Sequence, residues 1–133
     1  MKDYQNYNIY IGAIILLVLF SCKKTISVQL EWGTIETPKN VEAGLPITSK
    51  VQLMYSTTSY PINFQGFRTV EKSKNHFLIA APATIITHGA GSVNAMEWIM
   101  DTTYVLLTTS SGQYILDFVF KGNVMQSDTV DVR

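Results

Sequence analysis

From Thr25 onward, hydrophobic and polar side chains alternate along most of the chain. In the segment Ile26 to Trp32, four apolar residues alternate with Ser, Gln and Glu, as expected of a strand with one face in water. The same period of two predicts further strands at Ile47 to Tyr55, Tyr60 to Val70, His76 to Ala81, Ala83 to His88, Thr103 to Thr109, Gln113 to Lys121 and Thr129 to Arg133. Val93 to Met100 fits either a short helix or a strand. The pattern therefore predicts an all-β chain.

Turn residues separate these strands at intervals of roughly 8–12 residues, which is typical of a β-sandwich. Pro38 to Gly44 separates the first two strands, and Lys121-Gly122-Asn123 precedes the last one. Gly66 interrupts the alternation of the third strand and is a candidate bulge. Seven or eight strands without a long amphipathic helix predict an antiparallel β-sandwich over residues 26–133.

One short motif resembles a feature of immunoglobulin domains. Gly112-Gln113-Tyr114-Ile115-Leu116 resembles the G-x-Y-x-C corner, with Leu116 in place of the cysteine. A tyrosine at that corner buries its ring, and its hydroxyl bonds to backbone a few residues upstream. The segment Pro38 to Gly44 before the Ile47 strand also resembles the A-to-B segment of bacterial immunoglobulin-like modules. The resemblance implies an immunoglobulin-like sandwich, and the alternative is that Tyr114 is an ordinary core aromatic.

The N-terminal region has a different pattern. Ile9 to Phe20 is an apolar run of twelve residues that lacks charge, with Lys2 upstream. A membrane-spanning helix needs roughly 18 or more apolar residues, so this run is typical of the hydrophobic region of a signal peptide. We expect a lipoprotein signal peptide at residues 1–21, a short tether at 22–25 and the sandwich domain after it.

Cys22, the single cysteine of the chain, follows this run directly. Leu19-Phe20-Ser21-Cys22 resembles the bacterial lipobox, in which the cysteine thiol accepts a diacylglyceryl group, and the ending Ser-Cys-Lys-Lys resembles lipoproteins of Bacteroidetes. Two or three acyl chains, at ~0.8 kcal/mol per buried CH₂, hold a protein durably on a membrane. The alternative is a free thiol at the end of an uncleaved anchor helix. In such lipoproteins acidic residues after the cysteine accompany surface display, so Lys23 and Lys24 imply the periplasmic face.

Three further stretches are similar to the TraQ-type lipoproteins of Bacteroides conjugative transposons, which are small accessory proteins of a conjugal transfer apparatus. They are Pro38 to Gly44, Tyr60 to Gln65 and Gly112 to Asn123. The chain departs from that pattern at Thr109-Ser110-Ser111. The resemblance implies an immunoglobulin-like accessory or scaffold role, with no catalytic residues to carry over.

The composition of the chain excludes several classes of function. Ten Lys+Arg balance ten Asp+Glu, so the chain lacks the basic field on which nucleic-acid binding relies. One cysteine excludes an internal disulfide and a thiolate metal cluster. A content of 47% apolar and 15% charged residues is that of a folded domain.

We expect no catalytic residues, no cofactor and no metal site. His76 and His88 are the only imidazoles, and neither lies in a nucleophile-elbow motif or in a cluster of metal ligands. Asp117 is unusual because it interrupts the most apolar strand. Alternation places it on the face opposite Tyr114 and Leu116, where a solvated or cross-strand-paired carboxylate is expected.

Tyr60, Phe64, Phe67 and Arg68 form the candidate binding patch, because aromatic and guanidinium side chains are enriched at protein interfaces. The alternative is that these aromatics belong to the core. A second candidate contact is an edge strand, whose unpaired backbone groups invite a partner strand.

The sequence thus favours a lipid-anchored, non-catalytic structural or interaction component of a bacterial envelope complex, with a conjugal transfer accessory as the specific expectation. Its partners would be the membrane, through the N-terminal lipid, and other envelope proteins. The alternative is a carbohydrate- or ligand-binding lipoprotein of a nutrient-uptake system, with exposed aromatics on one sheet face. A hydrolase would need a pocket with two carboxylates or with a histidine held by an oriented partner.

Overall fold

The computed structural model describes residues 24–57, 61–87 and 96–133, and every regular element in these ranges is a strand. The strands are β1 (Lys24–Gln29), β2 (Glu31–Glu36), β3 (Asn40–Val41), β4 (Ile47–Thr57), β5 (Ile62–Phe64), β6 (Arg68–Ser73), β7 (His76–Ala80), β8 (Pro82–Thr87), β9 (Met96–Leu106), β10 (Gly112–Phe120) and β11 (Asn123–Val132). The predicted all-β class is confirmed. The predicted signal or anchor helix, residues 1–21, lies outside the described residues. Lys24 and Thr25, the end of the predicted tether, begin β1.

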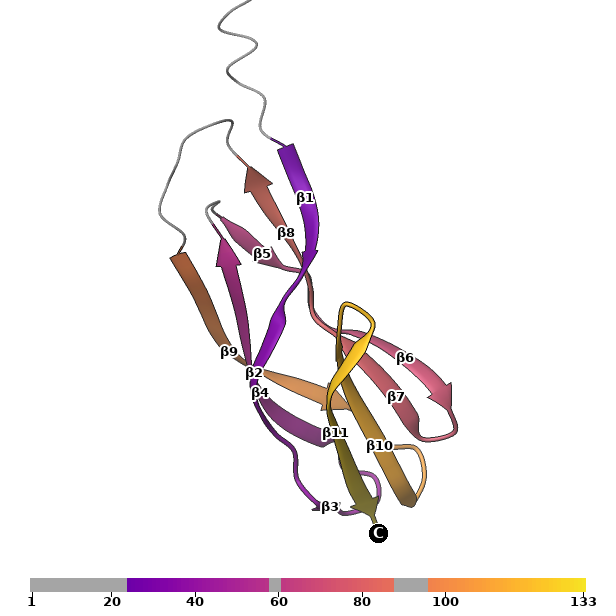
Figure 1. The fold of residues 1–133 in the computed structure, drawn as a ribbon. Coiled ribbons are helices and arrows are strands. Elements are labelled where there is room, and N and C mark those ends of the chain that lie inside the picture. Colours follow the sequence, from indigo (N-terminus) through magenta and orange to yellow (C-terminus); the bar gives the residue numbers. More distant parts are fainter. Residues whose placement is uncertain (1–23, 58–60, 88–95) are drawn as a thin grey trace, which may run out of the picture.

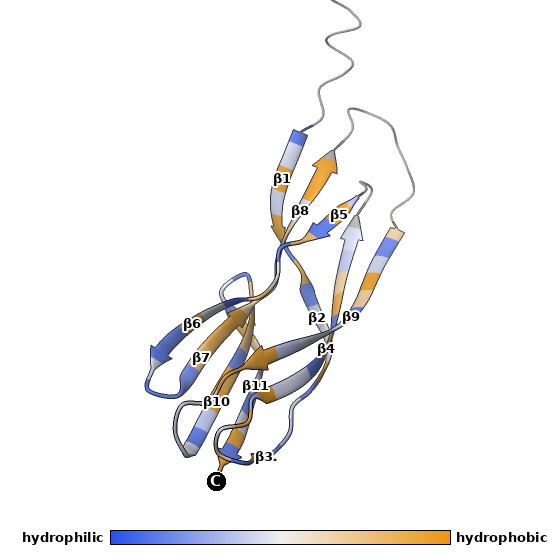
Figure 2. Cartoon of the chain, turned by 180° about the vertical axis from the view of Figure 1, so that it is seen from behind, coloured by the Kyte–Doolittle hydropathy of each residue, from blue (hydrophilic) through white to orange (hydrophobic). Residues whose placement is uncertain are grey.

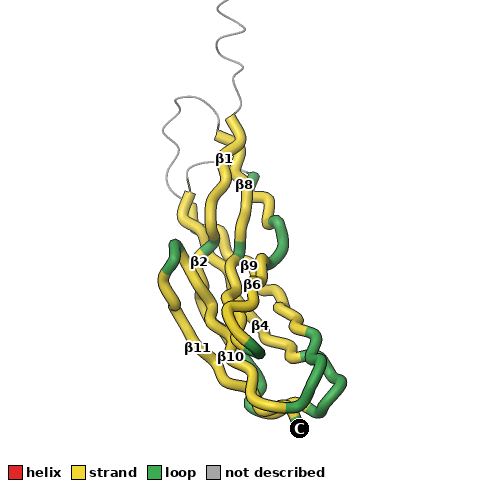
Figure 3. The backbone as a smooth tube through the Cα atoms, turned by 90° about the vertical axis from the view of Figure 1, so that its right-hand side faces the viewer, coloured by secondary structure: helices red, strands yellow, loops and turns green. Residues whose placement is uncertain are grey.

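The strands form three sheets, with the orders β1-β8-β5, β3-β11-β10-β7-β6 and β2-β4-β9 (Figure 1). The first sheet lies at the end of the molecule where the described chain begins, and the other two face each other near the C-terminus. Figure 3 shows the strands running along the length of an elongated molecule, with β1 and β8 at one end and the C-terminus at the other.

This arrangement corrects the predicted antiparallel sandwich of seven or eight strands. The described residues carry eleven strands, and two neighbouring pairs, β7–β10 and β3–β11, are parallel. The remaining pairs are antiparallel. Parallel neighbours require a crossover connection, so the alternation within each segment could not reveal them.

Several strands predicted as single elements change sheets midway. The segment 24–36 pairs with β8 before Leu30 and with β4 after it, and the segment 76–87 changes partners at Ala81. Leu30 N–H donates to Ala81 O at 2.8 Å, so the two crossing points are bonded to each other. Between β5 and β6 the change falls near Gly66, whose φ of +82° suits glycine. Gly66 therefore lies between two strands of different sheets, where a bulge was predicted.

The ambiguous segment Val93 to Met100 is resolved in part. Residues 96–100 belong to β9, which continues without interruption to Leu106 and pairs with β4 along its whole length. Of the predicted strand Thr103 to Thr109, residues 103–106 form the end of this 11-residue strand, and residues 107–109 lie outside it.

The core lies chiefly between the β2-β4-β9 sheet and the five-stranded sheet. Leu53 and Tyr104 from one sheet, and Leu116 and Phe118 from the other, are almost fully buried. Trp32 packs edge-on against Phe118, and its indole N–H donates to Val119 O at 2.9 Å. In Figure 2 the hydrophobic colour concentrates along β7 and β8, whereas the edge strand β6 is largely hydrophilic. Burial of apolar side chains between sheets is thus the main stabilising contribution.

Tyr114 has the buried ring and the backbone-bonded hydroxyl that the sequence predicted. Its ring is 1% exposed, and its hydroxyl donates to Ser110 O at 3.0 Å. The same hydroxyl accepts hydrogen bonds from the backbone N–H groups of Thr109 and Ser110, each at 3.3 Å. These bonds fix the chain where it enters β10. The next turn, Lys121-Gly122, has two positive φ values, as a two-residue hairpin requires.

Candidate functional site

The predicted site residues lie in three different settings. Cys22 and Tyr60 lie outside the described residues. Phe64 and Phe67 are partly buried and pack against the core, with their ring centroids 5.1 Å apart. Phe67 also stacks on Trp32 at 6.0 Å and packs edge-on against Tyr104 at 5.3 Å. These contacts favour the alternative that Phe64 and Phe67 belong to the core.

Arg68 is the exposed member of the predicted patch. It begins β6, an edge strand whose six residues are all exposed. The structure therefore separates the guanidinium from the two aromatics that the sequence grouped with it.

A second polar group forms on the five-stranded sheet, around Asp117 of β10. Ser127 lies directly opposite on β11, and its hydroxyl donates to Asp117 Oδ1 at 2.6 Å. His76 of β7, on the other side of β10, bonds Asp117 Oδ2 through Nε2 at 2.6 Å. One carboxylate thus links three adjacent strands. The cross-strand pairing expected of Asp117 is confirmed, and at 7% exposure the residue is buried rather than solvated.

The surroundings of Asp117 favour its ionised form. Burial by itself raises the pKa of the carboxyl group, because a low dielectric disfavours charge. The hydrogen bonds from Ser127 and His76, with the positive charges of His76 and Lys72, outweigh burial, so that the pKa lies below its ordinary value. The carboxylate is consequently an acceptor held by two partners.

The order of these three groups determines what they can do chemically. In a nucleophilic relay the imidazole stands between the hydroxyl and the carboxylate and takes the hydroxyl proton. Here the carboxylate stands in the middle, so the hydrogen-bond partner of Ser127 is Asp117. This geometry ties β7, β10 and β11 together. His88, the other histidine considered, lies outside the described residues.

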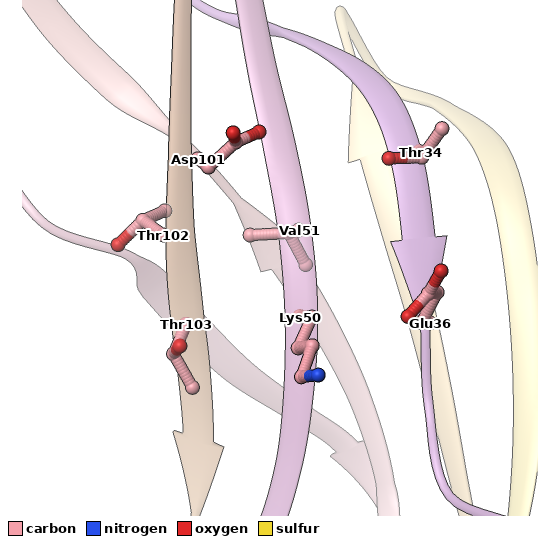
Figure 4. Close-up of a pocket in the computed structure, with 7 residues that line it drawn as sticks. All are labelled: Thr34, Glu36, Lys50, Val51, Asp101, Thr102 and Thr103. Atoms are coloured by element: carbon pink, nitrogen blue, oxygen red, sulfur yellow. The ribbon is translucent and has the colours of Figure 1, made fainter.

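The outer face of the β2-β4-β9 sheet carries a groove of about 430 Å³. Most of its lining side chains are polar and exposed: Thr34, Glu36, Lys50, Val51, Asp101, Thr102 and Thr103 (Figure 4). In Figure 4, Lys50 on β4 lies between Glu36 on β2 and the β9 residues Asp101 and Thr103. In register, Lys50 is opposite both Glu36 and Thr103. Such a surface offers donors and acceptors of both charges to a polar ligand or a polypeptide backbone.

Gly33 shapes one end of this face. It lies within the irregular stretch of β2 between Trp32 and Ile35. A Cβ on Gly33 would come within 2.9 Å of Gln52 Oε1, so the missing side chain leaves room for the carboxamide. Gln52 Nε2 donates to Asp101 Oδ1, directly opposite, at 3.0 Å. Sequence reasoning missed this groove, because its lining comes from three strands brought together by register.

Beside the groove, β9 forms one edge of its sheet. The sequence indicated that an edge strand would be a candidate contact, and the structure identifies a long one. Ile99 and Val105 lie on the outer face of β9, about half exposed at 52% and 51%.

The described ranges contain no group of three His, Cys, Asp or Glu side chains placed to hold a metal ion. Nor do residues 24–57, 61–87 and 96–133 include a helix with the length and hydropathy needed to cross a membrane. Comparisons with protein-family models, curated proteins and solved structures found no match to this chain.

Proposed function

We propose that this chain is a lipid-anchored, non-catalytic interaction component of a bacterial envelope complex, serving as an accessory protein of a conjugal transfer apparatus. Cys22 carries the lipid, and the β domain makes the contacts. The lipobox-like segment before Cys22 and the TraQ-like stretches support the two halves of the proposal. The periplasmic face of the membrane is the proposed location, since Lys23 and Lys24 follow the cysteine.

We assign the domain to a variant of the immunoglobulin-like sandwich. The Tyr114 corner, with its hydroxyl bonded to the Ser110 backbone, supports this assignment. The two facing sheets with a shared core support it as well. The parallel β7–β10 pair and the separate β1-β8-β5 sheet are the features that make it a variant.

The observation that carries the interaction role is the outer side of the β2-β4-β9 sheet. There an 11-residue edge strand with exposed Ile99 and Val105 runs beside a polar groove. Protein partners bind such surfaces by adding a strand to the edge, with backbone hydrogen bonds giving affinity and neighbouring pockets giving specificity.

Palmitate labelling tests the anchor. We expect incorporation by the wild-type chain, which fractionates with membranes, and loss of both in Cys22→Ala. Incorporation that is absent, or that persists in Cys22→Ala, would reject the anchoring half.

Affinity purification from solubilised membranes tests the interaction half. The wild-type chain should retain components of a transfer apparatus, identified by mass spectrometry, and Cys22→Ala should retain fewer because it is not concentrated at the membrane. Recovery of the chain without envelope proteins would reject this role.

The second candidate is a carbohydrate- or ligand-binding lipoprotein, and the polar groove favours it. Against it, Trp32 is buried and both Trp98 and Tyr55 pack against the core, so these rings do not form an exposed stacking row. Binding to a glycan array that is lost in Lys50→Ala would favour this candidate over the first.

A further inference from the structure

The free side of β9 differs from the other sheet edges. Among the described residues β9 pairs only with β4, so the backbone groups on its other side have no strand partner. Natural proteins protect edge strands by shortness, by charged side chains, especially Lys, by Pro, or by bulges. β9 is 11 residues long, has no Lys, no Pro and no register shift along its pairing with β4, and carries two charged side chains, Glu97 and Asp101.

The remaining free edges are protected. β11 pairs with β3 only at Asp131 and Val132, and a register shift opposite Phe118 and Val119 interrupts its free part. β3 and β5 have two and three residues. β6 carries Arg68, Glu71 and Lys72 and is exposed throughout. β2 has a register shift between Trp32 and Ile35, and β1 begins at Lys24. β9 is thus the long described edge that invites another strand.

The side chains of β9 are complementary to a second copy of β9. In an antiparallel self-pair the two-fold axis is perpendicular to the sheet, so each residue meets one that lies on the same face. An axis through Thr102 places Ile99 opposite Val105 and Asp101 opposite Thr103 in both directions. The two half-exposed apolar side chains of the outer face would then cover each other.

Neighbouring registers lack this complementarity. An axis through Asp101 places the two Asp101 carboxylates opposite each other, which is destabilising. An axis through Thr103 places Asp101 opposite Val105 and leaves both without a matching partner. The inner face agrees with the Thr102 axis, because there Met100 meets Tyr104 and Trp98 meets Leu106.

We propose that two copies of this chain pair through β9, antiparallel and centred on Thr102, to form a six-stranded sheet with the order β2-β4-β9-β9-β4-β2. The inference deepens the proposed function and rests on it, since it names a partner of the same surface. A single strand pair buries less area than a stable interface of ~1,600 Å², so the contact is weak between free molecules. A lipid anchor confines the copies to one surface and raises their effective concentration.

Disulfide cross-linking of the full chain in its own membranes tests the register. Opposite residues in antiparallel strands have Cα atoms ~4.5–5.5 Å apart, within the ~4.4–6.8 Å that a disulfide spans. The double variant Ile99→Cys with Val105→Cys should give a linked dimer on mild oxidation. A second double variant, Asp101→Cys with Thr103→Cys, probes the next pair and should do the same.

The controls are Ile99→Cys alone, Val105→Cys alone, and Val70→Cys on the β6 edge, which is exposed to a similar extent at 47%. None should exceed the dimer level of the wild-type chain, which accounts for any linkage through Cys22. Single variants that cross-link as strongly as the double variants, or two double variants without dimer, would overturn the inference.

The same membrane samples separate this inference from the proposed function. Cross-linking without dependence on Cys22 or membrane association would support the β9 pair and reject the anchored role. Membrane association with co-purified envelope proteins but no cross-linked dimer would reject the β9 pair alone.

Discussion

Two aspartates, Asp117 and Asp101, show how the same local chemistry serves different purposes on the two main sheets. Each lies within a strand and accepts a hydrogen bond from the residue directly opposite, Ser127 for Asp117 and Gln52 for Asp101. Asp117 is 7% exposed and has a second partner in His76. Asp101 is exposed and lines the groove. Burial therefore makes one carboxylate part of the internal structure and leaves the other accessible to partners.

The largest expected effect comes from removing the buried carboxylate. Asp117→Ala leaves Ser127 and His76 without their shared acceptor, and we expect a loss of about 3 kcal/mol in unfolding free energy. Urea denaturation followed by Trp fluorescence measures it. The matched variant Asp101→Ala should lose less than about 0.5 kcal/mol. Equal losses in the two variants would remove the distinction between the two sites.

Lowering the pH should remove part of the stability that the ionised Asp117 carboxylate contributes. The pKa of Asp117 is lower in the folded than in the unfolded chain, so its contribution is complete above the unfolded value of about 4 and declines as pH falls through the folded value. We expect the difference in unfolding free energy between wild type and Asp117→Asn to become smaller between pH 5 and pH 2, measured at intervals of about 1 pH unit. A difference for Asp117→Asn that is constant over this range would contradict the assignment.

Tyr114→Phe tests a buried hydroxyl of the core. The variant loses one donated hydrogen bond and leaves two backbone N–H groups without their acceptor, so we expect a loss of about 1–2 kcal/mol. Tyr104→Phe, whose hydroxyl bonds only the exposed Thr69 among the described residues, should lose less. Thermal denaturation of both variants measures the difference, and a greater loss in Tyr104→Phe would reverse this ranking.

The smallest effect is expected in the groove. Gln52→Ala removes the exposed hydrogen bond to Asp101, and we expect a change within about 0.5 kcal/mol. A double-mutant cycle with Asp101→Ala gives the coupling energy directly. Coupling above about 1 kcal/mol would mean that the groove, like the Asp117 group, is held as internal structure.

Local patterns predicted what depends on neighbouring residues in the chain. Alternation predicted the strands, and the Gly-x-Tyr motif predicted the bonded corner at Tyr114. Asp117 was recognised as unusual because it interrupts an apolar strand. Its pairing with Ser127 was not predicted, because the hairpin alone would place Asp117 opposite Gln126, and the register shift between Phe118 and Val119 brings Ser127 opposite it instead.

Long-range pairing explains what the sequence did not predict. His76 reaches Asp117 only because β7 and β10 are parallel neighbours, 41 residues apart in the chain for these two side chains. The groove depends on the register of three strands, and the irregular pairing at Gly33 sets one of those registers. Asp101-Thr102 interrupted the pattern between two predicted segments, so the continuity of β9 was not evident.

The central claim is that the outer side of the β2-β4-β9 sheet is the contact surface of an anchored interaction domain. Co-purification from membranes, comparing Ile99→Lys with Val105→Lys in one chain against Val70→Lys, tests it most directly. We expect the β9 variant to remain folded and membrane-bound but to lose the envelope proteins that wild type and Val70→Lys retain. Retention of the same proteins by the β9 variant, or their loss in Val70→Lys instead, would contradict the account.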